Sequence, residues 1–159
     1  MGVRAMKLQP GDELIDMSRL EEGQQILAIT TGGYGKRTDP DQYREQGRNG
    51  MGIRAMALTD RTGELAAQLA VYENEDIMLI TDDGTIIRMA VSDIRESGRN
   101  TQGVRLMRLS EGAKIVGVAR AEQEEPEEAD EAAFEEAVAK MTDETETVVD
   151  GSDGGDEEI

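Results

Sequence analysis

Cysteine, histidine and tryptophan are absent from the 159 residues, and phenylalanine occurs only once. Without cysteine the chain has no disulfide framework, no thiolate zinc site and no cysteine nucleophile. Without histidine it has no Ser-His or Cys-His catalysis and no imidazole metal ligand. These absences argue against a complete enzyme of the common hydrolytic kinds.

Long apolar runs are also absent. No run approaches the roughly 18 residues that a membrane span needs, and residues 1–10 lack the apolar core of a signal peptide. We therefore expect no membrane association and an intracellular, cytoplasmic location.

The whole chain has a formal net charge of -18, and positive charge is scarce only in its last quarter. Residues 1–120 carry 16 basic and 18 acidic side chains, whereas residues 121–159 carry 1 basic and 17 acidic ones. The shift predicts a body, 1–120, and an acidic, mostly disordered tail, 121–159, in which apolar spacing allows a short helix near 127–141. The tail either solubilises the protein or competes with nucleic acid for a basic face of the body.

The body repeats itself with a period of 50 to 51 residues. The run Gly2-Val-Arg-Ala-Met-Lys-Leu8 recurs as Gly52-Ile-Arg-Ala-Met-Ala-Leu58 and as Gly103-Val-Arg-Leu-Met-Arg-Leu109. In the same register, Gly47-Arg48-Asn49 returns as Gly98-Arg99-Asn100. Such periods are typical of solenoids, propellers and arrays of supersecondary units. The recurring methionines, Met6, Met56 and Met107, predict packing within the repeat.

Each repeat has the pattern of short β-strands. Turn residues, including the hairpin signal Asp82-Asp83-Gly84, separate four predicted strands at about 52–58, 64–71, 76–81 and 84–90. The preceding repeat predicts strands at 25–30 and 34–38. Four strands per repeat predict an all-β fold of propeller blades. Because the body holds two full repeats and the start of a third, we expect it to be the C-terminal piece of a larger repeat domain.

Two longer polar connections, residues 38–52 and 91–103, carry arginines in register. Arg44 corresponds to Arg95, and Arg48 corresponds to Arg99. A charge repeated with its structural unit predicts a repeated ligand, and the phosphate backbone of DNA fits the planar donor fork of arginine. The alternative is local pairing at the surface with the neighbouring carboxylates Asp39, Asp41, Glu45, Asp93 and Glu96.

At these residues the sequence resembles the C-terminal DNA-wrapping domain family of DNA gyrase A. The resemblance covers about residues 1–120 and rests on three groups of motifs. They are Gly33-Tyr-Gly-Lys-Arg-Thr38 with Tyr43-Arg44, Gln46-Gly-Arg-Asn-Gly-Met-Gly52, and the runs Asp76–Thr81, Gly84–Arg88 and Gly98–Val104.

The resemblance implies a six-bladed β-pinwheel, of which this chain would hold about two to three blades, with DNA bent around a basic rim. It implies that wrapping supports ATP-dependent negative supercoiling, with double-stranded DNA, the upstream remainder of gyrase A and its partner gyrase B in an A2B2 complex as partners. ATP and Mg would act on other domains or subunits, and this chain would hold no cofactor or metal. The implied DNA-binding residues are Lys36, Arg37, Arg44, Arg48, Arg88, Arg95 and Arg99.

Two departures from the family pattern leave rival interpretations open. The gyrase-defining box, Gln-Arg-Arg-Gly-Gly-Lys-Gly, has no full copy here, and residues 46–52 form only a degenerate version with Gly47 and Asn49 in place of Arg and Gly. The rivals are the equivalent C-terminal domain of topoisomerase IV and a propeller-like protein-interaction module. The domain that carries the DNA-linking tyrosine is also missing, so we expect no catalysis by this chain alone.

Overall fold

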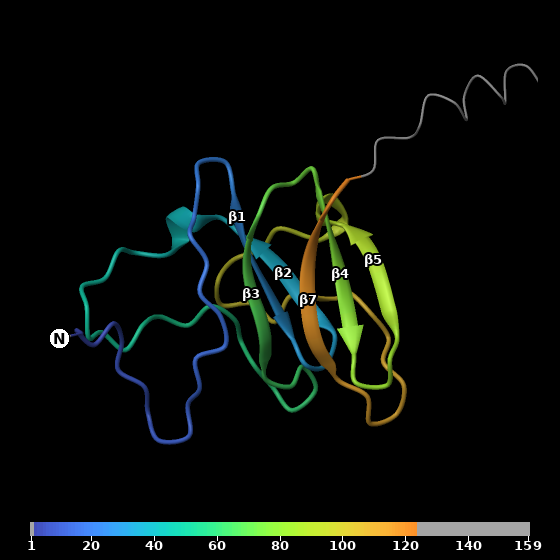
Figure 1. Cartoon of the computed structure of the whole chain (residues 1–159), viewed down its shortest axis with the longest axis horizontal. Helices are drawn as coiled ribbons and strands as arrows, with labels where there is room; N and C mark the ends of the chain where they lie inside the picture. The colour runs from blue at the N-terminus through green and yellow to red at the C-terminus, as the bar shows by residue number, and fades with distance from the viewer. Residues whose placement is uncertain (1, 124–159) are drawn as a thin grey trace, which may run out of the picture. The chain divides into compact units, whose positions relative to one another are not determined.

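The computed structural model describes residues 2–123. The chain divides into two units, Met1–Gln123 and Glu124–Ile159, and the first contains all the elements discussed below. Its strands form two antiparallel sheets that lie next to each other (Figure 1). The predicted all-β fold is confirmed for this unit. The predicted helix near 127–141 lies outside the described residues.

The first sheet has the strand order β3-β1-β2-β6. A hairpin joins β1 (Gln25–Thr30) to β2 (Tyr34–Thr38), and its turn uses the positive φ of 81° at Gly33. β3 (Leu65–Val71) pairs with the free side of β1. β6 (Val104–Arg105) pairs with β2 and places Arg105 opposite Tyr34.

The second sheet repeats this arrangement with the order β5-β4-β7. It comprises β4 (Glu75–Thr81), β5 (Ile86–Ala90) and β7 (Ile115–Glu122), which correspond to β1, β2 and β3. Both sheets shift register at the end of the corresponding strand, between Ile29 and Thr30 and between Ile80 and Thr81. β6 pairs with β2 in the first sheet. Within residues 2–123, the second sheet has no corresponding strand paired with β5.

The predicted strands at 25–30, 34–38, 64–71 and 76–81 match β1 to β4 to within one residue at each end, and β5 begins two residues after the predicted 84. The predicted strand at 52–58 is wrong, because this segment forms no strand in the structure. Its counterpart in the next repeat forms β6 only over Val104–Arg105, where the edge of β2 is available. The sheet that contains β1 and β2 is thus completed by a strand from two repeats later in the chain and not by one from its own repeat.

The main core lies between the two sheets. Leu27, Ile29 and Val71 of the first sheet face Ile77 and Leu79 of the second, and all five are fully buried. On the other face of β1 and β2, a smaller cluster contains Ala28, Tyr34 and Met56. The packing predicted for the repeated methionines is confirmed for Met56 and Met107, whereas Met6 is 40% exposed.

Candidate nucleic-acid interface

The two polar connections begin in the same way. A 3-10 turn, η1 (Pro40–Gln42), follows β2, and a second one, η2 (Val91–Asp93), follows β5. Asp39 caps η1, since its carboxylate accepts a hydrogen bond of 2.8 Å from the backbone N–H of Asp41. The repeat in sequence is therefore a repeat in structure at the point where each arginine-bearing segment leaves its sheet.

Hydrogen bonds bring the two connections together. The backbone N–H of Arg37 donates to the carbonyl of Arg95 (3.2 Å), and the N–H of Ser97 donates to the carbonyl of Arg37 (2.9 Å). Further along, the N–H of Arg99 donates to Oε1 of Gln42 (3.0 Å). The second connection thus runs along the end of β2 and reaches the beginning of the first connection.

Three of the predicted phosphate ligands are exposed on these connections: Arg44, Arg48 and Arg95. None of their side chains forms an ion pair with a carboxylate of residues 2–123. Two of the nearby carboxylates bond to other groups. Asp39 caps η1, and Glu96 accepts a hydrogen bond of 2.8 Å from Nε2 of Gln25. The local pairing that would have neutralised these three arginines is therefore not formed.

Lys36 occupies a different place from the one predicted. Its side chain is fully buried, and its Nζ donates to the carbonyls of Gly98 and Arg99, both at 2.7 Å, and to Oγ1 of Thr101 at 3.4 Å. Burial, and next the neighbouring Arg99 guanidinium, lower the pKa of Lys36 to about 8. Lys36 holds the second connection in place and has no surface from which to contact a phosphate.

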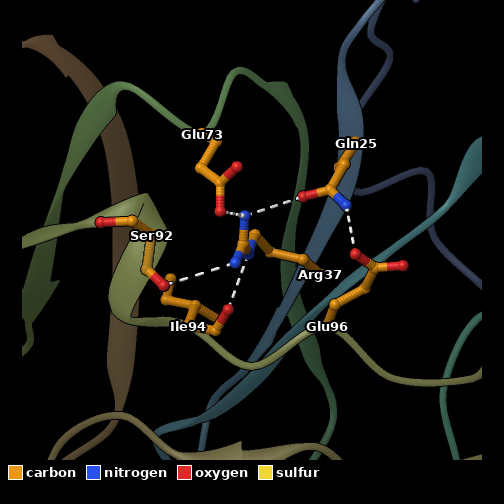
Figure 2. Close-up of polar contacts among 6 residues, drawn as sticks. All are labelled: Gln25, Arg37, Glu73, Ser92, Ile94 and Glu96. Atoms are coloured by element: carbon orange, nitrogen blue, oxygen red, sulfur yellow. Dashed lines mark hydrogen bonds and ion pairs between the residues drawn. The ribbon is translucent and has the colours of Figure 1, made fainter.

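Arg37 is also turned inward and is 6% exposed. Figure 2 shows its guanidinium surrounded by acceptors: Nε donates to the carbonyl of Ile94 (2.6 Å) and Nη2 to that of Ser92 (3.3 Å). Nη1 donates to Oε1 of Gln25 (2.9 Å) and pairs with Glu73 (3.1 Å). Arg37 therefore ties the first sheet to the segment after η2 instead of facing a rim.

Arg88, the repeat counterpart of Arg37, is more exposed but is engaged in the same way. Its Nε pairs with Asp76 at 2.7 Å, and its Nη2 donates to the carbonyl of Glu122 at 2.8 Å. Asp76 corresponds in register to Gln25, so each hairpin holds its arginine against the same neighbouring position. Arg99 is intermediate, since it is partly exposed and its Nη1 donates to the carbonyl of Arg54 at 2.7 Å.

The structure also gathers basic residues that the sequence pattern did not single out. Arg61 and Arg105 both lie over the ring of Tyr34, with Cζ 5.1 and 5.5 Å from the ring centroid. Arg108 lines an open groove together with Tyr34, Arg61 and Arg105. A signal was available for Arg105, because it belongs to the repeated Gly-Val-Arg motif and recurs as Arg4 and Arg54. No signal in sequence places Arg61 beside it.

Other kinds of site have little support in the described part of the chain. The acidic pair Asp82 and Asp83 forms a turn, as its sequence predicts: Asp82 accepts from the N–H of Lys114 (2.9 Å) and Asp83 from that of Thr85 (3.2 Å). Residues 2–123 contain no group of three or more acidic side chains that could hold a metal ion. None of their helices is long and apolar enough to cross a membrane.

Comparison with known proteins identifies a family and a fold. A family model described as DNA gyrase C-terminal domain, beta-propeller, matches residues 1–21, 24–68 and 75–122. The chain is 43% identical over 119 residues to the DNA gyrase A protein of Streptomyces coelicolor, a match that covers 75% of this chain and 14% of that protein. It is 44% identical over 122 residues to the DNA gyrase A protein of Pseudomonas aeruginosa, a match that covers 77% of this chain and 13% of that protein.

Solved structures agree with this match. A DNA gyrase A C-terminal domain superposes with a TM-score of 0.71 at 25% identity, over 76% of this chain and 41% of that one. The C-terminal domain of a DNA topoisomerase IV also gives a TM-score of 0.71, at 23% identity, over 86% of this chain and 43% of that one. The second likeness supports the fold alone. The predicted blade architecture is confirmed by both.

Proposed function

The chain belongs to the family of DNA gyrase C-terminal β-propeller domains, and from that premise we propose that it binds double-stranded DNA without base specificity. In this proposal it acts as part of a DNA gyrase A protein, wraps DNA and so supports ATP-dependent negative supercoiling. Since the chain spans about 14% of the length of the curated relatives it matches, these roles of the whole protein are proposals.

One observation carries the proposal. Arg44, Arg48 and Arg95 are exposed on two neighbouring connections and form no ion pair with the described carboxylates. Their guanidinium groups offer planar donor forks at repeat-related places, which suits a regularly spaced phosphate backbone. Contacts of this kind position a duplex and carry no base information, so we expect binding to be independent of sequence.

The partners follow from the same proposal. The blades would join the upstream remainder of gyrase A, which would act with gyrase B in an A2B2 complex. ATP and Mg would be used on those other parts, so we expect this chain alone neither to hydrolyse ATP nor to cleave DNA. A cytoplasmic location in contact with the nucleoid completes the proposal.

The first test is binding of the chain to random-sequence duplex DNA across a salt series. If about five to seven phosphates are contacted, log K falls with log salt with a slope of about -5 to -6. Charge reversal at Arg44 and Arg95 should flatten the slope and weaken binding. The control is Arg19→Glu, because Arg19 is exposed but lies among the acidic residues Glu21 and Glu75 at the β3 side of the sheet.

Two outcomes would redirect the proposal. A folded chain with no DNA binding at low salt would contradict it and favour a protein-interaction module, in which the arginines serve a protein partner. Binding without wrapping would favour a domain of the topoisomerase IV kind. Wrapping is measured by sealing a nicked DNA circle with ligase while the chain is bound. The change in linking number of the sealed circle is then counted.

A further inference from the structure

Two exposed arginines, Arg61 and Arg105, lie over one buried tyrosine near an edge of the first sheet, and a third, Arg108, lines the groove beside it. We call Tyr34, Arg61, Arg105 and Arg108 the Tyr34 cluster. Tyr34 is 4% exposed and begins β2, whereas β6, which carries Arg105, is the edge strand. Nε and Nη2 of Arg105 donate to the Tyr34 hydroxyl at 3.3 and 3.0 Å. The tyrosine thereby fixes one guanidinium at the edge of the blade.

Glycines bring the other two arginines close. At Gly32 an added Cβ would lie 2.5 Å from the carbonyl oxygen of Thr62, so only glycine lets the turn that carries Arg61 approach the hairpin. At Gly33 an added Cβ would lie 2.8 Å from the carbonyl oxygen of Met107, the residue before Arg108. Two segments, about 30 and 70 residues after the hairpin, thus pack against its turn. Their backbones can come this close because glycine has no side chain there.

No carboxylate in the described part of the chain compensates the charge of the cluster. None of its arginines forms an ion pair with a carboxylate of residues 2–123, although Asp60 and Glu64 flank Arg61 in sequence. Gathering like charges is unfavourable, and an anion placed among them removes that repulsion. Arg105 keeps three of its five N–H donors beyond the two that Tyr34 accepts. The cluster lines an open groove of about 610 Å³.

We propose that the Tyr34 cluster is a phosphate-binding site, and that it holds the DNA backbone against the edge strand of the blade. This inference rests on the proposed function and adds residues to it. Arg105 recurs in register as Arg4 and Arg54, so the repeat would present an arginine at the same place wherever this segment pairs with the edge of a blade. The site is distinct from the exposed arginines of the two polar connections.

The test measures the salt dependence of duplex DNA binding for the whole chain and its variants. Each loss of a phosphate contact lowers the slope of log K against log salt by about 0.9. We therefore expect R61Q, R105Q and R108Q each to flatten the slope by about 0.9, and the triple variant by about 2 to 3. Y34F should cost less than R105Q, because it removes only the hydroxyl that orients Arg105.

The matched control is R19Q, which removes the same charge at the opposite edge of the sheet and should leave the slope unchanged. Circular dichroism and thermal unfolding check that the glutamine variants fold like the parent chain. A parallel titration with inorganic tripolyphosphate distinguishes a DNA backbone from a free polyphosphate ligand. Flattened slopes in the cluster variants, with weak tripolyphosphate binding, would support the proposal.

Two results would overturn it. If the parent chain binds DNA steeply and the triple variant keeps the full slope, the cluster is not a DNA site, while the proposed function stands. If the parent chain binds no DNA but binds tripolyphosphate through the three arginines, both DNA assignments fail and the ligand is a free polyphosphate.

Discussion

Arg37 offers the sharpest test of the structure, because sequence and structure assign it opposite roles. As a rim residue its loss would weaken DNA binding and leave stability unchanged. As the buried residue seen in Figure 2 its loss would unfold the protein more easily and leave the exposed arginines intact. The substitution Arg37→Met keeps the apolar stem and removes only the guanidinium, so it separates the two roles.

The expected loss of stability can be worked out contact by contact. The bonds to Ile94 at 2.6 Å and Gln25 at 2.9 Å are short and shielded, and hydrogen bonds to a charged group contribute about 1.5 to 3 kcal/mol each. The contact to Ser92 is long at 3.3 Å, and the Glu73 side chain is 71% exposed, so the ion pair adds at most about 1 kcal/mol. Met recovers part of this total, because the cost of keeping the guanidinium out of water disappears. We expect a net loss of about 3 kcal/mol, within the range for removing one partner of a buried charged contact.

Urea denaturation measures this loss as a lower midpoint at an unchanged slope. The same substitution at the counterpart Arg88, whose side chain is 36% exposed, should cost about 1 kcal/mol or less, and at the exposed Arg44 under about 0.5 kcal/mol. If Arg37→Met unfolds like the parent chain but binds DNA with a flatter salt slope, the structural role of Arg37 is refuted and the rim role is restored.

Other parts of the chain give three more expected outcomes. The pKa of Lys36 is about 8 in the folded protein and 10.5 for an ordinary lysine, so the unfolded state binds more protons between these pH values. The free energy of unfolding should therefore rise with pH across that window. This rise should be missing in Lys36→Met when urea midpoints are compared at pH 7 and pH 10. Gly103→Ala should cost about 2 kcal/mol or more in the same assay, because its added Cβ would lie 2.4 Å from the carbonyl oxygen of Gly35, whereas Gly112→Ala has the same kind of positive φ in open space and should cost only about 1 kcal/mol. Removing residues 124–159 takes away most of the acidic tail and should tighten DNA binding at low salt if the tail competes for the basic face, whereas an unchanged Kd would leave it a solubilising role.

The fold was largely predictable because its signals are local. The Asp82-Asp83-Gly84 turn and the run Ile77–Ile80 mark β4 and β5 within ten residues, and the repeat transfers the same assignment to β1 and β2. The edge strand was not predictable in the same way. Whether residues 52–58 or 103–109 form a strand depends on a free edge in another repeat, and only Val104–Arg105 finds one in the described part of the chain.

The site was predictable only in part. The repeat register shows that a charged residue recurs, but it does not show whether its side chain points into the protein or to the surface. Lys36 and Arg37 are neighbours in a strand and therefore point to opposite faces, yet both are buried. Their acceptors, the carbonyls of Gly98 and Ile94, lie some 60 residues later in the chain and leave no trace in local sequence. Arg44 and Arg95, in contrast, lie outside the strands and remain exposed.

A repeated arginine can nevertheless be sorted by asking whether its acceptor repeats as well. Arg37 lies 12 residues after Gln25, and Arg88 lies 12 residues after Asp76, so each hairpin carries both the donor and a side chain that accepts from it. That co-repetition is typical of a structural contact, because the protein supplies both halves. Arg105 has no carboxylate to pair with it in the described residues, and its hydrogen-bond partner is the hydroxyl of Tyr34. An unpaired charge that belongs to a motif recurring in each repeat is the arrangement that a ligand with regularly spaced negative charge requires.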